Sequence, residues 1–140
     1  MELIKNRFCH WNGEHLVVDT MVRSHKMVNS MGTGEGLVSF DGFGADLIRF
    51  SKNEGMQNHT HLGHHILFVL AGTGYVIYAG EKHEIEPGVC YFVNGEIDHA
   101  IKATSDLVML VVGNNHCAVD SQDRTTLVPY REGTPEELKV

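Results

Sequence analysis

Short apolar or alternating runs, each closed by a turn signal, divide the middle of the chain into predicted strands. The runs cover residues 37–40, 45–51, 65–71, 75–78, 83–86, 89–93, 99–103 and 107–113. Glycine-containing turns separate several of them, at Asp41-Gly42, Ala79-Gly80, Pro87-Gly88 and Asn94-Gly95. Short strands at this spacing, without helical periodicity, predict an all-β sandwich or closed barrel.

The flanks carry weaker signals. Residues 15–22 have the composition of a strand, whereas the glycine-rich segment 27–36 is expected to be a loop. Near the end, Thr134-Pro135-Glu136-Glu137 combines a capping threonine, a proline at the first helical position and a capping-box glutamate, so we expect a short C-terminal helix. The 140 residues suit one domain, with a barrel core at about 37–113, N-terminal strands and a loop at 1–36, and a tail at 114–140.

The composition argues against nucleic-acid and membrane partners and indicates the cellular compartment. The net charge of −7 offers no basic face for nucleic acid. No segment approaches the roughly 20 apolar residues that cross a bilayer, and the start lacks a signal peptide, so we expect no membrane partner. Cys9, Cys90 and Cys117 form no CxxC pair, which favours a reducing, cytoplasmic location. The apolar neighbours of Cys90 indicate that its thiol is buried in the core.

Histidine is the compositional excess, with 10 in the chain and six of them between residues 59 and 99. His59 and His61 fall on the same side of an extended strand, because side chains alternate with a period of two. A bend at 62–64 then lets the chain present His65 from the next strand, which is apolar on both faces and therefore predicted to be buried. His99 follows a turn and starts another strand. We predict that these four imidazoles converge on one metal ion.

The remaining histidines carry weaker interpretations. Because side chains alternate along a strand, His64 points away from His65. We therefore interpret His64 as a surface residue or as a residue that contacts the metal ligands without binding the metal. His116 and Cys117 either approach the site or mark a loop, and both roles stay open. Ordinary solvated side chains are expected at His10, His15, His25 and His83.

The two histidine stretches resemble the paired motifs of the cupin superfamily. The first motif is glycine, His-x-His, a metal-binding glutamate and glycine, and it aligns with Gly55, His59, His61, His65 and Gly72. The second, Pro-Gly followed by an apolar strand, a turn and a histidine, aligns with Pro87-Gly88 and His99. The resemblance covers residues 45–112.

This resemblance implies a jelly-roll barrel, that is, a double-stranded β-helix, with one divalent transition metal ion in each chain. Imidazole ligands accept Fe, Mn, Ni, Cu, Co or Zn, so the sequence does not name the metal. A homodimer is expected by the same analogy. If His59, His61, His65 and His99 bind the metal, each should donate its other ring N–H to a carbonyl, carboxylate or water, and Asp98 and Glu96 are near His99 in sequence.

The chain departs from the family motifs at the metal site. His65 stands where most relatives have glutamate, Val89 where they have aspartate after Pro-Gly, and residues 94–98 replace a proline-rich turn. Four neutral imidazoles leave the 2+ charge of the ion uncompensated, which favours an anionic ligand. His65 also removes a carboxylate that could serve as a general base.

The resemblance implies a metal-dependent enzyme, first of all a dioxygenase acting on a small enolate, diketone or phenolic substrate. Two alternatives stay open: a non-oxidative lyase, isomerase or decarboxylase, and a module that binds a metal or small ligand without turnover. Apart from histidine, the candidates for acid–base or substrate-contacting roles are Tyr75, Tyr91, Arg49 and Glu96, each of which has a structural interpretation as well.

Overall fold

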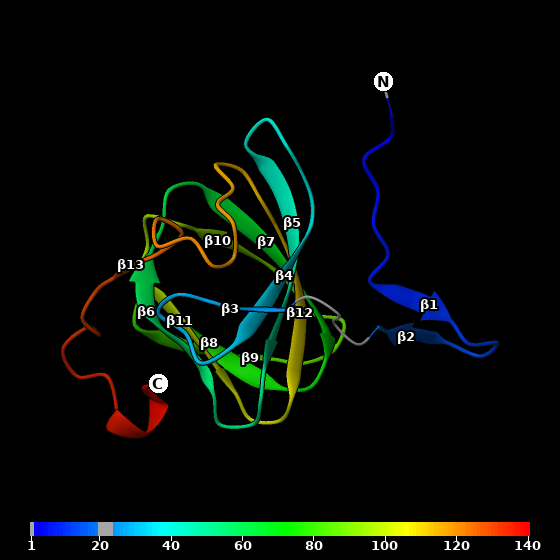
Figure 1. Ribbon diagram of the computed structural model, residues 1–140. Coiled ribbons are helices and arrows are strands. Elements are labelled where there is room, and N and C mark those ends of the chain that lie inside the picture. The colour runs from blue at the N-terminus through cyan, green and yellow to red at the C-terminus, as the bar shows by residue number, and fades with distance from the viewer. Residues whose placement is uncertain (1, 20–23) are drawn as a thin grey trace.

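The structure, a computed structural model, describes residues 2–19 and 24–140, and its regular secondary structure is almost entirely antiparallel strands (Figure 1). The elements are β1 (Cys9–Trp11), β2 (Leu16–Val18), β3 (His25–Lys26), β4 (Thr33–Phe40), β5 (Phe43–Phe50), β6 (Gly55–Thr60), β7 (His64–Ala71), β8 (Gly74–Tyr78), β9 (Glu81–Ile85), β10 (Cys90–Asn94), β11 (His99–Ala103), β12 (Leu107–Gly113), β13 (Thr126–Leu127) and the 3-10 turn η1 (Glu136–Leu138).

Two sheets face each other and enclose the interior. One has the strand order β10-β7-β12-β5-β4-β3 and the other β13-β6-β11-β8-β9. From β5 to β12 the chain changes sheet at every connection except the β8–β9 hairpin, so neighbours in sequence usually face each other across the barrel. This arrangement confirms the predicted all-β jelly roll.

Two tight hairpins within the sheets, β4–β5 and β8–β9, have the turn chemistry that the sequence predicts. Asp41 and Gly42, between β4 and β5, have φ angles of 48° and 78°. Ala79 and Gly80, between β8 and β9, have φ angles of 53° and 82°. Positive φ at both central residues defines the turn whose twist matches paired strands, and glycine adopts it without steric cost.

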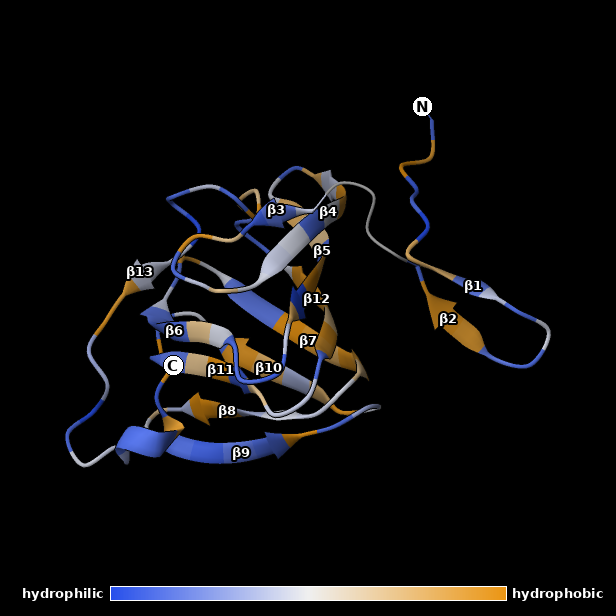
Figure 2. Ribbon diagram, turned by 60° about the horizontal axis from the view of Figure 1, so that its bottom comes forward, coloured by the Kyte–Doolittle hydropathy of each residue, from blue (hydrophilic) through white to orange (hydrophobic). Residues whose placement is uncertain are grey.

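The apolar core fills the space between the sheets, and Leu67 and Val69 of β7 lie in it, 4% and 3% exposed. The prediction that β7 is buried on both faces is wrong, because Ile66 and Phe68 point outward and are 43% and 38% exposed. Cys90, paired with Phe68 in the register, is likewise exposed rather than a core residue. Figure 2 shows hydrophobic stretches along β7, and the exposed fractions show that such a stretch includes outward-facing residues.

The flanks differ from the predictions in several places. The segment expected to be a loop ends early, because β4 begins at Thr33 and pairs with β5. The strand expected at 15–22 is β2, and residues 20–22 lie outside the described part of the chain. The predicted C-terminal helix is a single 3-10 turn, and the Thr134 hydroxyl donates to the Arg131 carbonyl (2.7 Å) instead of capping it. β13 is a strand that the sequence did not predict.

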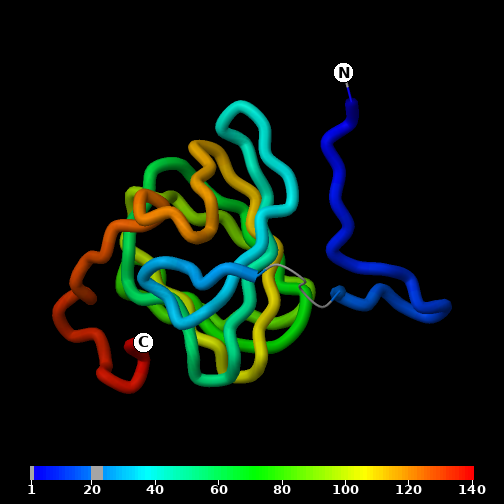
Figure 3. Tube along the Cα trace, in the orientation of Figure 1, coloured from blue at the N-terminus to red at the C-terminus, as the bar shows by residue number. Residues whose placement is uncertain are grey.

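The N-terminal hairpin formed by β1 and β2 extends away from the barrel, as the blue trace shows in Figure 3. The Asn6 side chain connects this arm to the barrel through a hydrogen bond to the Leu37 carbonyl (3.1 Å). Among residues 2–19 and 24–140, no helix has the length and apolar character needed to cross a bilayer.

Candidate metal centre

Three histidines from two paired strands meet inside the barrel. His59 lies in β6, His61 follows its end, and His99 begins β11 directly opposite His59 in the register. All three are buried, and one ligand nitrogen from each lies within 4.8 Å of the others. The His59 and His99 ring centroids are 4.1 Å apart, and His61 Nε2 lies 3.1 Å from His99 Nε2. The three imidazoles therefore converge on one point.

Backbone carbonyls fix which ring nitrogen faces this point. His59 Nδ1 donates to the Gln57 carbonyl and His99 Nδ1 to the Ile97 carbonyl, each at 2.7 Å. Because a carbonyl only accepts, both Nδ1 atoms carry the proton, and both Nε2 atoms keep a free lone pair. For His59 and His99 this is the partner arrangement expected of metal-ligating histidines, whereas Nδ1 of His61 has no hydrogen-bond partner among the described residues.

The two acidic residues proposed as partners of His99 do not take that role. Asp98 instead accepts hydrogen bonds from Arg131, at 2.8 Å from Nη2 and 3.1 Å from Nε. Glu96 is exposed, and its backbone N–H donates to the Asn94 side chain. The Ile97 carbonyl, which lies between them in sequence, is the acceptor.

The donor geometry fits a divalent transition metal. Metal–imidazole bonds of about 2.1 Å place neighbouring ligand nitrogens roughly 3.0–3.4 Å apart in octahedral or tetrahedral coordination. The 3.1 Å separation of His61 Nε2 and His99 Nε2 lies in that range. His59, His61 and His99 could thus hold the ion.

His65, the fourth predicted ligand, lies beside this group without joining it. Its ring centroid is 4.3 Å from that of His61, and it lines the same cavity, but it is not one of the three residues whose nitrogens lie within 4.8 Å of one another. Gly113, opposite His65 in the register, leaves room for the ring, since a Cβ there would lie 2.2 Å from His65 Cδ2. A metal-binding role for His65 therefore stays a prediction.

The histidines border a cavity of about 30 Å³ with otherwise mostly apolar walls. None of the described residues that line it carries a carboxylate. Its other polar side chains are Tyr91, Arg124 and Thr125. Arg124 and Thr125 come from the C-terminal tail, which the sequence analysis did not connect with the site.

The surroundings keep the imidazoles neutral. Burial lowers the pKa of all four, to about 4 for His99 and to about 2 for His65. Repulsion by neighbouring histidines adds to the effect, from His99 on His59 and from His61 on His65. Neutral imidazole is the form that binds metal, so the site is ready to accept a cation at neutral pH.

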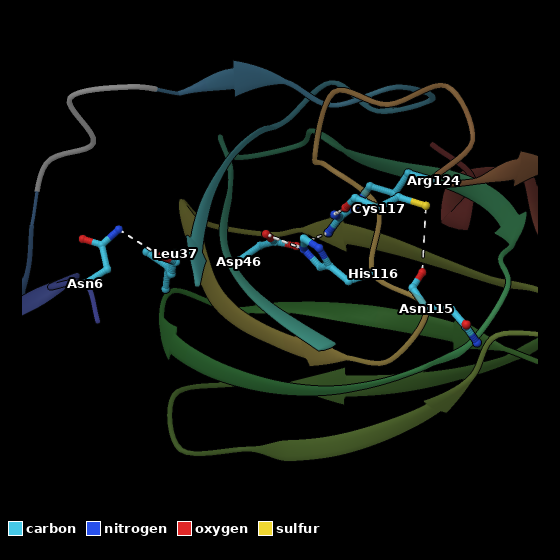
Figure 4. A network of polar contacts seen from close by, with 7 residues as sticks. All are labelled: Asn6, Leu37, Asp46, Asn115, His116, Cys117 and Arg124. Atoms are coloured by element: carbon cyan, nitrogen blue, oxygen red, sulfur yellow. Dashed lines mark hydrogen bonds and ion pairs between the residues drawn. The ribbon is translucent and has the colours of Figure 1, made fainter. Parts of the chain in front are cut away.

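A buried ion-pair network attaches the tail to the barrel (Figure 4). Asp46 of β5 is 1% exposed, and its carboxylate accepts hydrogen bonds from Arg124 Nη2 (2.8 Å) and His116 Nε2 (3.0 Å). Arg124 Nη1 donates to the Cys117 carbonyl (2.6 Å). His116 and Cys117, whose roles the sequence left open, therefore help to hold Arg124 at the cavity wall. A charged residue inside the apolar run 45–51 was the signal that could have revealed this network.

The four residues that the sequence suggested for catalysis lie in different places, and only some of them are near the cavity. Tyr91 lines the cavity. Tyr75 packs with Tyr130 and Leu138 and donates to the Leu138 carbonyl (3.1 Å), away from the cavity. The Arg49 guanidinium donates to the Asp19 carbonyl, and the Glu96 side chain is exposed. Of the four, Tyr91 alone is placed to act at the metal centre.

Comparisons with known proteins identify the family that the barrel resembles. The profile of the family described as "Cupin domain" matches residues 46–113. The chain is similar to the L-ectoine synthase of Hyphomonas neptunium, with 32% identity over 79 residues that span 54% of this chain and 58% of the synthase.

Solved structures share the fold at low sequence identity. The polyketide cyclase RemF of Streptomyces resistomycificus superposes with a TM-score of 0.61 and 20% identity over 84% of this chain and 90% of the cyclase. Salicylate 1,2-dioxygenase of Pseudoaminobacter salicylatoxidans, solved with gentisate, matches with a TM-score of 0.57 and 14% identity over 59% of this chain but 25% of its own.

We expect alanine substitution of His59, His61 or His99 to weaken metal binding by more than about 100-fold, because loss of even an outer partner of a ligand costs 10–100-fold. Cobalt titration of protein purified without chelator or nickel affinity measures this. His83→Ala, on exposed β9, is the control and should bind like the parent. His65→Ala tests the fourth ligand, and full affinity in that variant would contradict the prediction for His65.

The metal-free protein should lose stability on acidification. The folded-state pKa values of these histidines lie below the unfolded value of 6.5, so below that pH the unfolded chain binds more protons. The free energy of unfolding should therefore fall between about pH 7 and pH 4, by up to about 1.4 kcal/mol per pH unit for each such histidine. Urea unfolding at several pH values checks this, and His99→Ala should reduce the slope. A pH-independent stability would contradict it.

Asp46→Asn should destabilise the protein by about 3–5 kcal/mol, because it leaves the buried Arg124 guanidinium without its counter-charge. Asp98→Asn is the matched control, since it breaks an Asp–Arg pair whose Arg131 side chain is half exposed, and it should cost at most about 1 kcal/mol. Urea unfolding compares the two variants. Equal losses would show that the buried network does not anchor the tail as described.

Proposed function

Because residues 46–113 of this chain are a cupin domain, we propose that the protein is a metal-dependent enzyme acting on a small anionic oxygen compound at His59, His61 and His99. The observation that carries this proposal is the donor set: three buried imidazole nitrogens converge, and no carboxylate among the described residues lines their cavity. Neutral ligands leave the charge of a divalent ion uncompensated, so an anionic oxygen is the ligand that complements the site.

Within this class we propose dioxygenase chemistry on an enolate, diketone or phenolate. A redox-active divalent ion at the site would supply Lewis acidity and a path for electrons to O2. The protein keeps the imidazoles neutral and surrounds the site with mostly apolar walls. The Gln57 and Ile97 carbonyls orient the rings of His59 and His99. Without a carboxylate base at the cavity, a substrate that ionises easily suits the site best.

A non-oxidative reaction is the second candidate, and the similarity to L-ectoine synthase favours it. The same imidazole centre would then hold an ion that polarises a carbonyl, and O2 would take no part. A module that binds a metal or small ligand without turnover is the third candidate. The homodimer and the cytoplasmic location expected from the sequence stay predictions.

Oxygen uptake distinguishes these functions. We expect iron-, manganese- or nickel-loaded protein to consume O2 when one of a panel of diketones, flavonols or catechols is added, as measured with an oxygen electrode and product analysis. His61→Ala should lose this uptake, and His83→Ala should keep it. Turnover without O2 uptake would contradict the dioxygenase and support the non-oxidative enzyme. Tight metal binding without any turnover would support the binding module.

A further inference from the structure

Tyr91 places a hydroxyl group in the barrel interior that nothing in the described part of the chain satisfies. It pairs with Leu67 in the register and lies two residues before Val93, which pairs with His65. Its side chain therefore lies on the inner face of β10 and lines the cavity together with the histidines. The hydroxyl oxygen is buried and has no hydrogen-bond partner among the described residues.

Among the four tyrosines the unpartnered hydroxyl of Tyr91 is the exception, although Arg49 Nε, Asn58 Oδ1 and His61 Nδ1 are also buried without a partner among the described residues. Each hydroxyl of the other three tyrosines is paired: Tyr75 with the Leu138 carbonyl (3.1 Å), Tyr78 with the Asn94 N–H (3.3 Å) and Tyr130 with the Val140 N–H (3.0 Å). A buried hydroxyl without a partner costs about 1–3 kcal/mol, and phenylalanine would fill the same space without that cost. The hydroxyl of Tyr91 therefore calls for a partner that is not part of the chain.

The direction of the Tyr91 side chain indicates where that partner lies. The ring also borders a hollow of about 240 Å³ between β8, β9 and β10, which is half open to solvent. A hydroxyl pointing into that hollow would be accessible to water, whereas this one is buried. The other space that Tyr91 borders is the cavity that it lines together with His59, His61 and His99, so a ligand of those histidines is the partner nearest to hand.

Tyr91 can supply a hydrogen-bond donor to the cavity. His59 and His99 present acceptor nitrogens, since their N–H groups are used by carbonyls. Two of the Arg124 guanidinium nitrogens, Nη1 and Nη2, are engaged by the Cys117 carbonyl and Asp46. Burial raises the pKa of Tyr91, so its phenol keeps its proton and remains a donor at neutral pH.

We propose that Tyr91 is a catalytic residue whose hydroxyl donates a hydrogen bond to the anionic oxygen of the ligand bound at the three-histidine centre. This inference rests on the proposed function, because it requires an anionic ligand there. It also narrows the substrate, which must present a negatively charged oxygen to a neutral donor as well as to the metal. Such a donor is most effective in a dry site, where it needs no reorganisation as charge develops.

Tyr91→Phe and Tyr75→Phe form a matched pair, since each removes one hydroxyl. Tyr91→Phe should bind cobalt like the parent but bind acetohydroxamate, an anionic oxygen chelator, at least about 10-fold more weakly in cobalt-loaded protein, because it loses a hydrogen bond to a charged group. Its melting temperature without ligand should be equal to or above that of the parent. Tyr75→Phe should show the reverse: unchanged acetohydroxamate affinity and a lower melting temperature.

The outcomes separate this inference from the proposed function. Parent-like acetohydroxamate affinity in Tyr91→Phe, or a melting temperature lowered as in Tyr75→Phe, would overturn the role of Tyr91 and leave the metal centre standing. Loss of cobalt from Tyr91→Phe would overturn it too, by making Tyr91 a metal ligand. If the parent protein itself bound neither cobalt nor acetohydroxamate, the proposed function would fail, and the inference about Tyr91 with it.

Discussion

The hydrogen bonds from His59 Nδ1 and His99 Nδ1 to the carbonyls two residues before each ring determine the chemistry of the barrel interior. They fix the tautomer, hold both rings, and leave Nε2 as a lone-pair donor on the inner side. The β6–β11 pairing, which sets His59 opposite His99, then brings these nitrogens together. The site is a consequence of backbone geometry, and no acidic side chain is needed to orient these two rings.

None of the described residues that line the histidine cavity has a carboxylate side chain. The buried carboxylate of Asp46 is paired with the Arg124 guanidinium, which neutralises it, and it also accepts a hydrogen bond from His116, so it is not free to act as a base or a ligand. Arg124 in turn forms part of the cavity wall. A divalent ion bound among neutral imidazoles would therefore retain most of its charge, and the compensating negative charge has to come from the bound molecule.

Periodicity predicted the strands from residue 37 to 113 because that signal is local and repeats. It failed for the outer face of β7 and for Cys90, because an apolar run does not say which face another layer covers. The convergence of His59, His61 and His99 followed from strand parity and motif spacing. The tail network did not, because Asp46 and His116 are 70 residues apart and pair only through tertiary structure. The capping motif near Thr134 failed since a local signal cannot supply the packing that a helix needs.

The tail is attached to the barrel mainly by side-chain contacts, above all the buried Arg124–Asp46 ion pair, and by little strand pairing. β13 pairs with β6 through Thr126 and Leu127 alone, whereas β12 pairs along its whole length with β5. The space of about 30 Å³ beside the histidines has room for a single small species, so a larger molecule fits there only if a wall moves. Entry of such a molecule would then be a gated step, and its observed association rate would level off with concentration at the rate at which the wall moves.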